Sequence, residues 1–104
     1  MSKHQSVLYQ ILKAVSEETE ISSEKMLSRN SGMEVVDARW ISVKLLYEYG
    51  FYTNRIAECM RITPRYVQYI LTNFEDRILI SKLMRNSYER IKTTLRNINE
   101  TNSF

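Results

Sequence analysis

The side chains best suited to nucleic-acid chemistry lie together on one predicted helix. Its outward positions carry Arg65, Gln68 and Tyr69. Val67 and Ile70 fall on the opposite side at helical spacing and are expected to pack inward. A guanidinium can donate two hydrogen bonds to guanine, a glutamine amide can pair with adenine, and a tyrosine can contact a thymine methyl or a phosphate. The pattern therefore predicts that these three outward residues read DNA bases.

The start of this helix is marked by Thr63 and Pro64. A threonine hydroxyl can accept from free backbone donors, and proline has no donor to lose at the first helical position. Upstream, the small Ala57 leaves room for two helices to cross closely. Arg61 stands where the general bacterial helix-turn-helix often has glycine, so it must accept a positive φ or widen the turn. We predict a helix-turn-helix over about residues 53–74.

Three further residues are predicted to contact the DNA backbone from the helix ends, namely Arg55, Arg61 and Thr63. Contacts of this kind fix the register of a protein on DNA and do not read sequence. The charge distribution agrees. Residues 1–54 carry six lysines and arginines against seven acidic residues, whereas residues 55–96 carry nine against four. The positive excess therefore begins with the predicted motif, as expected for a segment that approaches phosphates.

The composition predicts an all-α fold. The 104 residues include only two glycines and one proline, and apolar residues recur at three- and four-residue spacings almost throughout. A hydrophobic content of 43% suits one core, so we expect a single domain over residues 1–104. The predicted architecture is a small helical bundle with a long C-terminal helical extension. Helices are expected at about 5–18, around Met26 and Leu27, at 34–49, 53–60 and 64–74, and at 76–98.

Several local features are predicted along these helices. Ser22 is expected to cap the short second helix, and Thr53 the helix that begins the motif. Gly50 is expected just after the end of the preceding helix, where a left-handed residue is common. Within that helix Trp40 and Tyr49 are candidate core residues, because aromatic side chains dominate core burial.

The last predicted helix carries an apolar stripe with alternating four- and three-residue steps. Its members are Ile80, Met84, Tyr88, Ile91, Leu95 and Ile98. This heptad-like spacing is typical of a dimerising surface. A terminal helix that folds back onto the protein's own core needs the same stripe, so the sequence leaves both interpretations open.

The sequence offers little for catalysis. One cysteine and one histidine provide neither a disulfide framework nor a metal-ligand cluster, and Cys59 is expected to pack within the helix pair. We therefore expect no enzyme activity, cofactor, metal or small-molecule substrate. Neither a signal-peptide pattern nor a long apolar run is present, which predicts a cytoplasmic protein without a membrane partner. If the protein binds DNA, it is expected to be nucleoid-associated.

From about Gln5 to Phe74 the chain resembles the C-terminal DNA-binding domain of the replication initiator DnaA, a Trp-repressor-like helical fold. The likeness lies in the order of an Ile-Ser step at Ile21–Ser22, an Ala-Arg pair ending at Arg39, and then the motif. The resemblance implies that Arg39 contacts the DNA backbone. Thr63-Pro64-Arg65-Tyr66 replaces the family's Asp-His-Thr-Thr, which implies a different DNA site. Without a Gly-rich phosphate loop, initiator activity itself is not expected.

The leading prediction is sequence-specific binding of double-stranded DNA by a small transcription regulator or a replication-associated accessory protein. Such a protein should dimerise on DNA, because one short helix reads one half-site weakly. The runner-up is a protein-interaction or homodimerisation module that uses the C-terminal stripe. A third interpretation is an RNA or single-strand binder, in which some of the seven tyrosines stack on bases.

Overall fold

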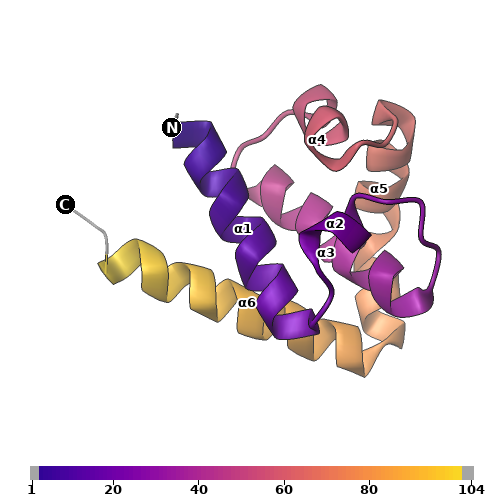
Figure 1. Cartoon of the computed structure of the whole chain (residues 1–104). Helices are drawn as coiled ribbons and strands as arrows, with labels where there is room; N and C mark the ends of the chain where they lie inside the picture. The colour runs from indigo at the N-terminus through magenta and orange to yellow at the C-terminus, as the bar shows by residue number, and fades with distance from the viewer. Residues whose placement is uncertain (1–2, 102–104) are drawn as a thin grey trace.

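The computed structural model describes residues 3–101, and every regular element within that range is an α-helix. The predicted all-α fold is confirmed. The helices are α1 Lys3–Thr19, α2 Ser23–Met26, α3 Met33–Glu48, α4 Thr53–Met60, α5 Pro64–Ile80 and α6 Lys82–Thr101 (Figure 1). No helix within residues 3–101 combines the length and apolar content needed to cross a membrane.

Helix α3 forms the centre of the fold. It carries buried residues around most of its circumference, from Val35 through Leu46, as expected for a helix surrounded by others. Helices α1, α2, α4 and α5 all pack against it, and α6 closes the bundle against α1 and α5. In Figure 1 α4 and the start of α5 lie at the upper right, and α5 runs down the right-hand side to join α6, which lies along the bottom. The outer side of α5 is thereby left open.

Two of the predicted turn features are confirmed. The Ser22 hydroxyl accepts from the backbone N–H of Lys25 at 3.2 Å and caps α2. Gly50 has φ of 95°, and the next N–H donates back to the carbonyl of Leu46 at 3.0 Å, which closes the end of α3. The predicted cap at Thr53 is wrong. Tyr52 has the extended N-cap backbone instead, so Thr53 is already the first residue of α4.

Of the two aromatic residues predicted to lie in the core, one is buried and the other is exposed. Trp40 is buried, with 5% of its surface exposed, and contributes to the core as predicted. Tyr49 is wrong as a core residue, because 39% of it is exposed. The regular helix ends at Glu48, and the Tyr49 side chain accepts a hydrogen bond from Asn99 of α6 at 3.2 Å. A side chain just past the helix end no longer follows the apolar stripe.

The apolar stripe of the C-terminal segment folds back onto the protein's own core. Met84, Tyr88, Ile91 and Leu95 each expose 3% or less of their surface. Ile80 departs from the stripe and is 87% exposed. The reason is a break in the helix at Ser81, whose extended backbone separates α5 from α6. The stripe as a whole therefore does not form an outward surface for a partner.

Tyr88 fastens α6 to the centre of the fold. Its hydroxyl donates to the Glu48 carboxylate at 2.7 Å, and its ring meets Phe74 of α5 edge-on at 4.9 Å. The Lys92 ammonium lies 4.3 Å above the same ring. Burial, and next the hydrogen bond to Glu48, raise the pKa of Tyr88 far above the ordinary tyrosine value. Tyr88 therefore stays protonated to a higher pH than an exposed tyrosine does.

The buried tyrosine predicts a specific loss of stability in alkali. A raised pKa stabilises the fold fully below about pH 10, the value in the unfolded chain, and this contribution is lost as the pH rises further. Tyr88→Phe should cost about 1 kcal/mol at neutral pH, because one hydrogen bond disappears, and should fall less steeply above pH 10. Urea unfolding between pH 7 and pH 11 measures both effects. Tyr52→Phe, at an 84% exposed position, is the matched control. Parallel curves for Tyr88→Phe and wild type would contradict the assignment.

Candidate nucleic-acid interface

The turn between α4 and α5 is built from local hydrogen bonds. Arg61 takes the left-handed conformation, with φ of 58° and ψ of 41°. The next N–H, of Ile62, donates to the carbonyl of Ala57 at 3.0 Å, the same closure that Gly50 gives to α3. The Thr63 hydroxyl accepts from the N–H of Tyr66 at 3.0 Å, and Pro64 opens α5. Of the two alternatives at Arg61, the chain adopts the positive φ.

Arg61 predicts a small gain of stability on substitution. A residue with a Cβ is disfavoured in the left-handed region, by about 1 kcal/mol, and glycine is not. Arg61→Gly should therefore raise the free energy of unfolding by up to about 1 kcal/mol in urea titration. Arg61→Ala removes the same charge and keeps the Cβ, so it should give no such gain. Equal stabilisation by both variants would assign the effect to charge.

Helix α5 has a buried side and an open side. Val67, Ile70 and Phe74 are completely buried and fix the helix against α3, α4 and α6. On the other side Arg65 and Gln68 are exposed, and neither has a hydrogen-bond partner among the described residues. Tyr69, one turn after Arg65, is 57% exposed. The three predicted base-reading residues therefore share one accessible side of α5.

An aromatic cluster supports the Tyr69 ring. Tyr66 is half-buried, and its ring stacks on Tyr69 with centroids 6.3 Å apart and an interplanar angle of 19°. The indole of Trp40 meets Tyr69 edge-on at 5.9 Å and donates from Nε1 to the Tyr66 hydroxyl at 3.2 Å. These contacts restrict the rotamers of Tyr69 and keep its ring on the open side of α5. The Tyr69 ring is therefore held in a defined position.

A partly buried ion pair supports this cluster from the Trp40 ring. Arg77 donates from Nε and Nη2 to one carboxylate oxygen of Asp37, at 2.9 and 2.6 Å. Its guanidinium lies 4.6 Å from the centroid of the Trp40 ring, in a cation–π contact. Arg77 is therefore a positioning residue. Sequence reasoning did not identify it, because its partner Asp37 lies 40 residues away and neither residue forms a motif.

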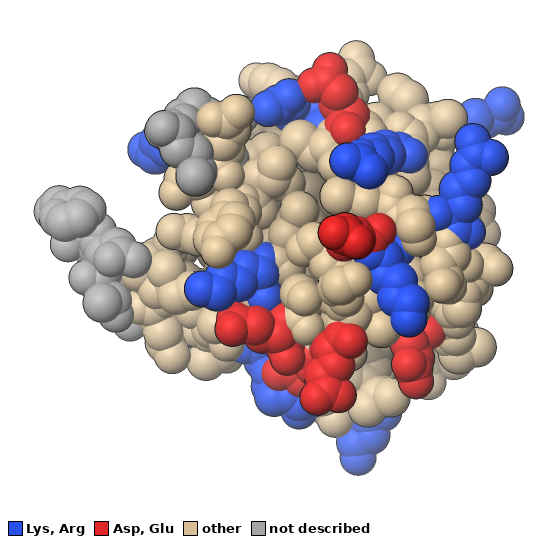
Figure 2. Space-filling model, viewed as in Figure 1, with Lys and Arg blue, Asp and Glu red and all other residues tan. Residues whose placement is uncertain are grey.

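The residues predicted to contact the DNA backbone from α4 and the following turn are accessible. They differ in whether they form an ion pair. Arg55 is bridged to Glu58 at 2.6 Å on the surface of α4, a type of pair that contributes little to stability and is easily exchanged. Arg61 is exposed and forms no ion pair within residues 3–101. Thr63 is exposed, and its hydroxyl, which accepts from Tyr66, still has a proton to donate. Figure 2 shows lysine and arginine side chains along the upper and right-hand edges, with an acidic side chain among those at the top, whereas most acidic side chains on this face lie at the lower centre beside further basic ones.

Arg39, to which the resemblance gives a contact with the DNA backbone, is buried and lies outside this accessible surface. Only 5% of it is exposed. Its guanidinium donates to three backbone carbonyls around the α2–α3 connection, those of Met26 at 2.8 Å, Ser28 at 2.8 Å and Asn30 at 3.0 Å. Its Nε and Nη2 donors are thus directed to the protein's own backbone. In this structure Arg39 holds the α2–α3 loop.

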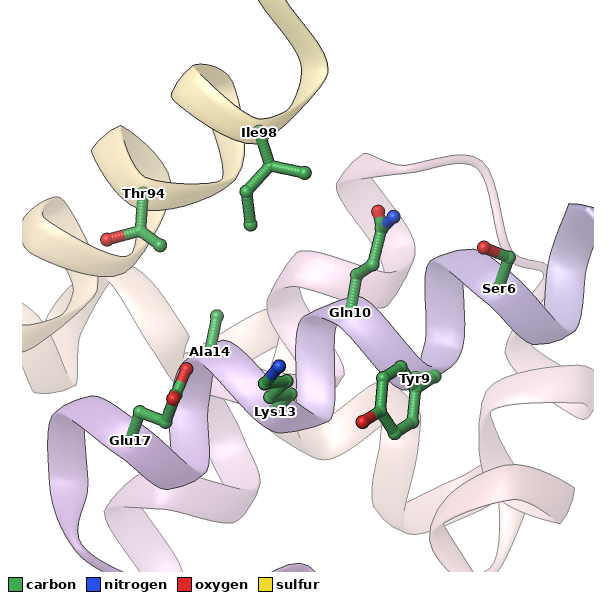
Figure 3. Close-up of a pocket in the computed structure, with 8 residues that line it drawn as sticks. All are labelled: Ser6, Tyr9, Gln10, Lys13, Ala14, Glu17, Thr94 and Ile98. Atoms are coloured by element: carbon green, nitrogen blue, oxygen red, sulfur yellow. The ribbon is translucent and has the colours of Figure 1, made fainter. Parts of the chain in front are cut away.

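The remaining candidate features do not form a second site. Cys59 is half-buried in the helix pair as predicted, and burial raises the pKa of its thiol, so the thiolate is scarce at neutral pH. A groove of about 410 Å³ lies between α1 and α6 (Figure 3). Ile98 of α6 points toward α1 there. In the part of the chain that the structure describes, no acidic, histidine or cysteine side chains are grouped as metal ligands.

Neither family models nor curated proteins match this chain. The likeness to the initiator's DNA-binding domain therefore rests on the quoted residues alone. Of those residues, Ser22 and Arg39 have structural roles here, as the α2 cap and as the anchor of the α2–α3 loop. The exposed side of α5 remains as the candidate binding surface.

Proposed function

We propose that this protein binds double-stranded DNA sequence-specifically, with α4 and α5 as a helix-turn-helix and α5 as the recognition helix. The observation that carries the proposal is the division of α5 into a completely buried side and an exposed side with Arg65, Gln68 and a supported Tyr69. A major groove admits one α-helix, and these side-chain types make base contacts in it. Base readers near the start of the helix agree with the usual docking geometry.

The flanking residues provide the contacts that would fix register. Arg61 and Thr63 lie just before the start of α5, where a phosphate would also meet the positive end of the helix dipole. Arg55 can exchange its surface carboxylate for a phosphate. We therefore retain these three residues as backbone contacts and leave out Arg39. A role in transcription or as a replication-associated accessory protein is part of the same proposal.

The proposal is tested by fluorescence anisotropy of a labelled random-sequence duplex at low and at near-physiological salt. Binding should weaken steeply with salt, because each neutralised phosphate releases counterions. Arg61→Ala should reduce the slope of log K against log salt by about 1. Arg96→Ala, which removes an exposed arginine from α6, is the matched control and should leave the slope unchanged. No binding at low salt would refute the proposal, and preference for single strands would favour a tyrosine-stacking binder.

A further inference from the structure

An apolar corner remains exposed where α5 meets α6. Leu79 and Ile80 end α5, and Leu83 lies in the first turn of α6. They are 74%, 87% and 75% exposed. We call these three residues the α5–α6 elbow. Three large aliphatic side chains exposed within five positions form the kind of patch that marks an interaction surface on a small protein.

The elbow is held in a defined shape. The backbone of Ser81 is extended, and its hydroxyl accepts from the N–H of Met84 at 3.2 Å, which caps α6. Arg85 reaches back and donates to the carbonyl of Ile78 at 2.8 Å, which satisfies the end of α5. The apolar side chains are therefore presented by a turn that these hydrogen bonds hold, and a partner would meet a preorganised surface.

The charges beside the elbow carry both signs. Asp76 lies one turn before Ile80 on α5, and Lys82 opens α6 next to Leu83. Both are exposed, and neither forms an ion pair within residues 3–101. A membrane surface or nucleic acid would favour cations alone. Leu83 also borders a groove whose lining includes Glu20 and Glu34, so carboxylates lie on more than one side of the apolar centre. A second copy turned by a two-fold rotation can place its Lys82 against these carboxylates.

We propose that a second copy of this chain docks on the elbow. The two apolar centres meet, and Asp76 of each copy faces Lys82 of the other. That carboxylate also approaches the positive end of the α6 dipole, which favours an anion there. The contact is smaller than the about 800 Å² per partner of a standard interface, so the free dimer is weak, with a dissociation constant on the order of micromolar or above.

The position of the elbow sets how far apart the two α5 helices of the dimer would lie on DNA. This step alone rests on the proposed function. Helix α5 has 17 residues, or about 24 Å from its first to its last turn. The two base-reading ends would then lie one helix length from the two-fold axis. That reach spans the separation of about 34 Å between successive major grooves when the two helices diverge from the axis.

The dimer is tested without nucleic acid, so its failure is separate from failure of DNA binding. Sedimentation equilibrium of the full chain at concentrations on the order of 10 to 500 µM should show a monomer–dimer equilibrium. Ile80→Glu should weaken the dimer at least tenfold, because it places a charge in the apolar centre. Tyr52→Glu, at an equally exposed position outside the elbow, should leave it unchanged.

A charge-reversal pair tests the geometry. Asp76→Lys and Lys82→Asp should each weaken self-association, because like charges then face each other. An equimolar mixture of the two variants restores opposite charges at both contacts, so heterodimers should form at least as readily as the wild-type dimer. Monomeric wild type throughout the concentration range, or a mixture that stays monomeric, would overturn the proposal. Binding of monomeric protein to anionic vesicles would overturn it in favour of a membrane surface.

Discussion

Replacement of Arg39 by alanine is expected to destabilise the protein by about 3 kcal/mol, because buried hydrogen bonds from a charged donor each contribute about 1.5–3 kcal/mol and some freed carbonyls regain water. Three carbonyls around the α2–α3 connection lose their donor together. The loss is a large fraction of the 5–15 kcal/mol typical of a whole domain. Urea unfolding at neutral pH measures it.

Two variants sharpen the Arg39 prediction. Arg39→Lys keeps the charge but has no planar fork to reach three acceptors, so most of the loss should remain. Arg65→Ala removes an exposed arginine of the same type and should change stability by less than about 0.5 kcal/mol. The opposite result would be informative. Unchanged stability of Arg39→Ala, with a smaller salt slope for DNA, would restore the phosphate contact that the resemblance implies.

The contrast between Arg39 and Thr63 shows which features the sequence could predict. The Thr63 cap joins atoms three residues apart, so composition and spacing determine it. Arg39 instead binds carbonyls 9 to 13 residues away, and a backbone carbonyl has no side-chain signal in the sequence. Asp37 and Arg77 lie 40 residues apart, and no pattern in the sequence marks them as partners. The caps at Ser22 and Thr63 and the helix faces were therefore predictable, although the cap predicted at Thr53 is not formed, whereas supports between helices were not predictable.

The apolar stripe of the C-terminal segment shows a second limit. Periodicity correctly identified an apolar helix side that includes Met84 and Leu95, but the same spacing serves a dimer or a core. Only packing against α1 and α5 decides between them. Ile80 fits the periodic series and is nevertheless exposed, because the single break at Ser81 turns it away. A continuous helical pattern did not reveal that break.

The largest effect on recognition is expected from Arg65 and Gln68. On a duplex site selected from a random library, Arg65→Ala and Gln68→Ala should each reduce affinity by about 1–3 kcal/mol, because each removes a bidentate contact to a base. The double variant should lose about 30-fold or more in affinity, and stability should stay near that of wild type, since both side chains are exposed. Competition anisotropy between the selected site and single-base variants measures the loss and locates the base that each residue reads.

The matched controls are Arg96→Ala and Asn97→Ala on α6, which remove the same chemical groups from exposed positions. Neither should change site preference. A base reader also relaxes preference at one position only, so Gln68→Ala should bind the selected site and its single-base variant at the adenine equally well. If Arg65→Ala weakens binding to every sequence alike, Arg65 contacts phosphate and the reading surface lies farther along α5. If both variants retain full site preference, α5 is not the recognition helix, and its open side serves another partner.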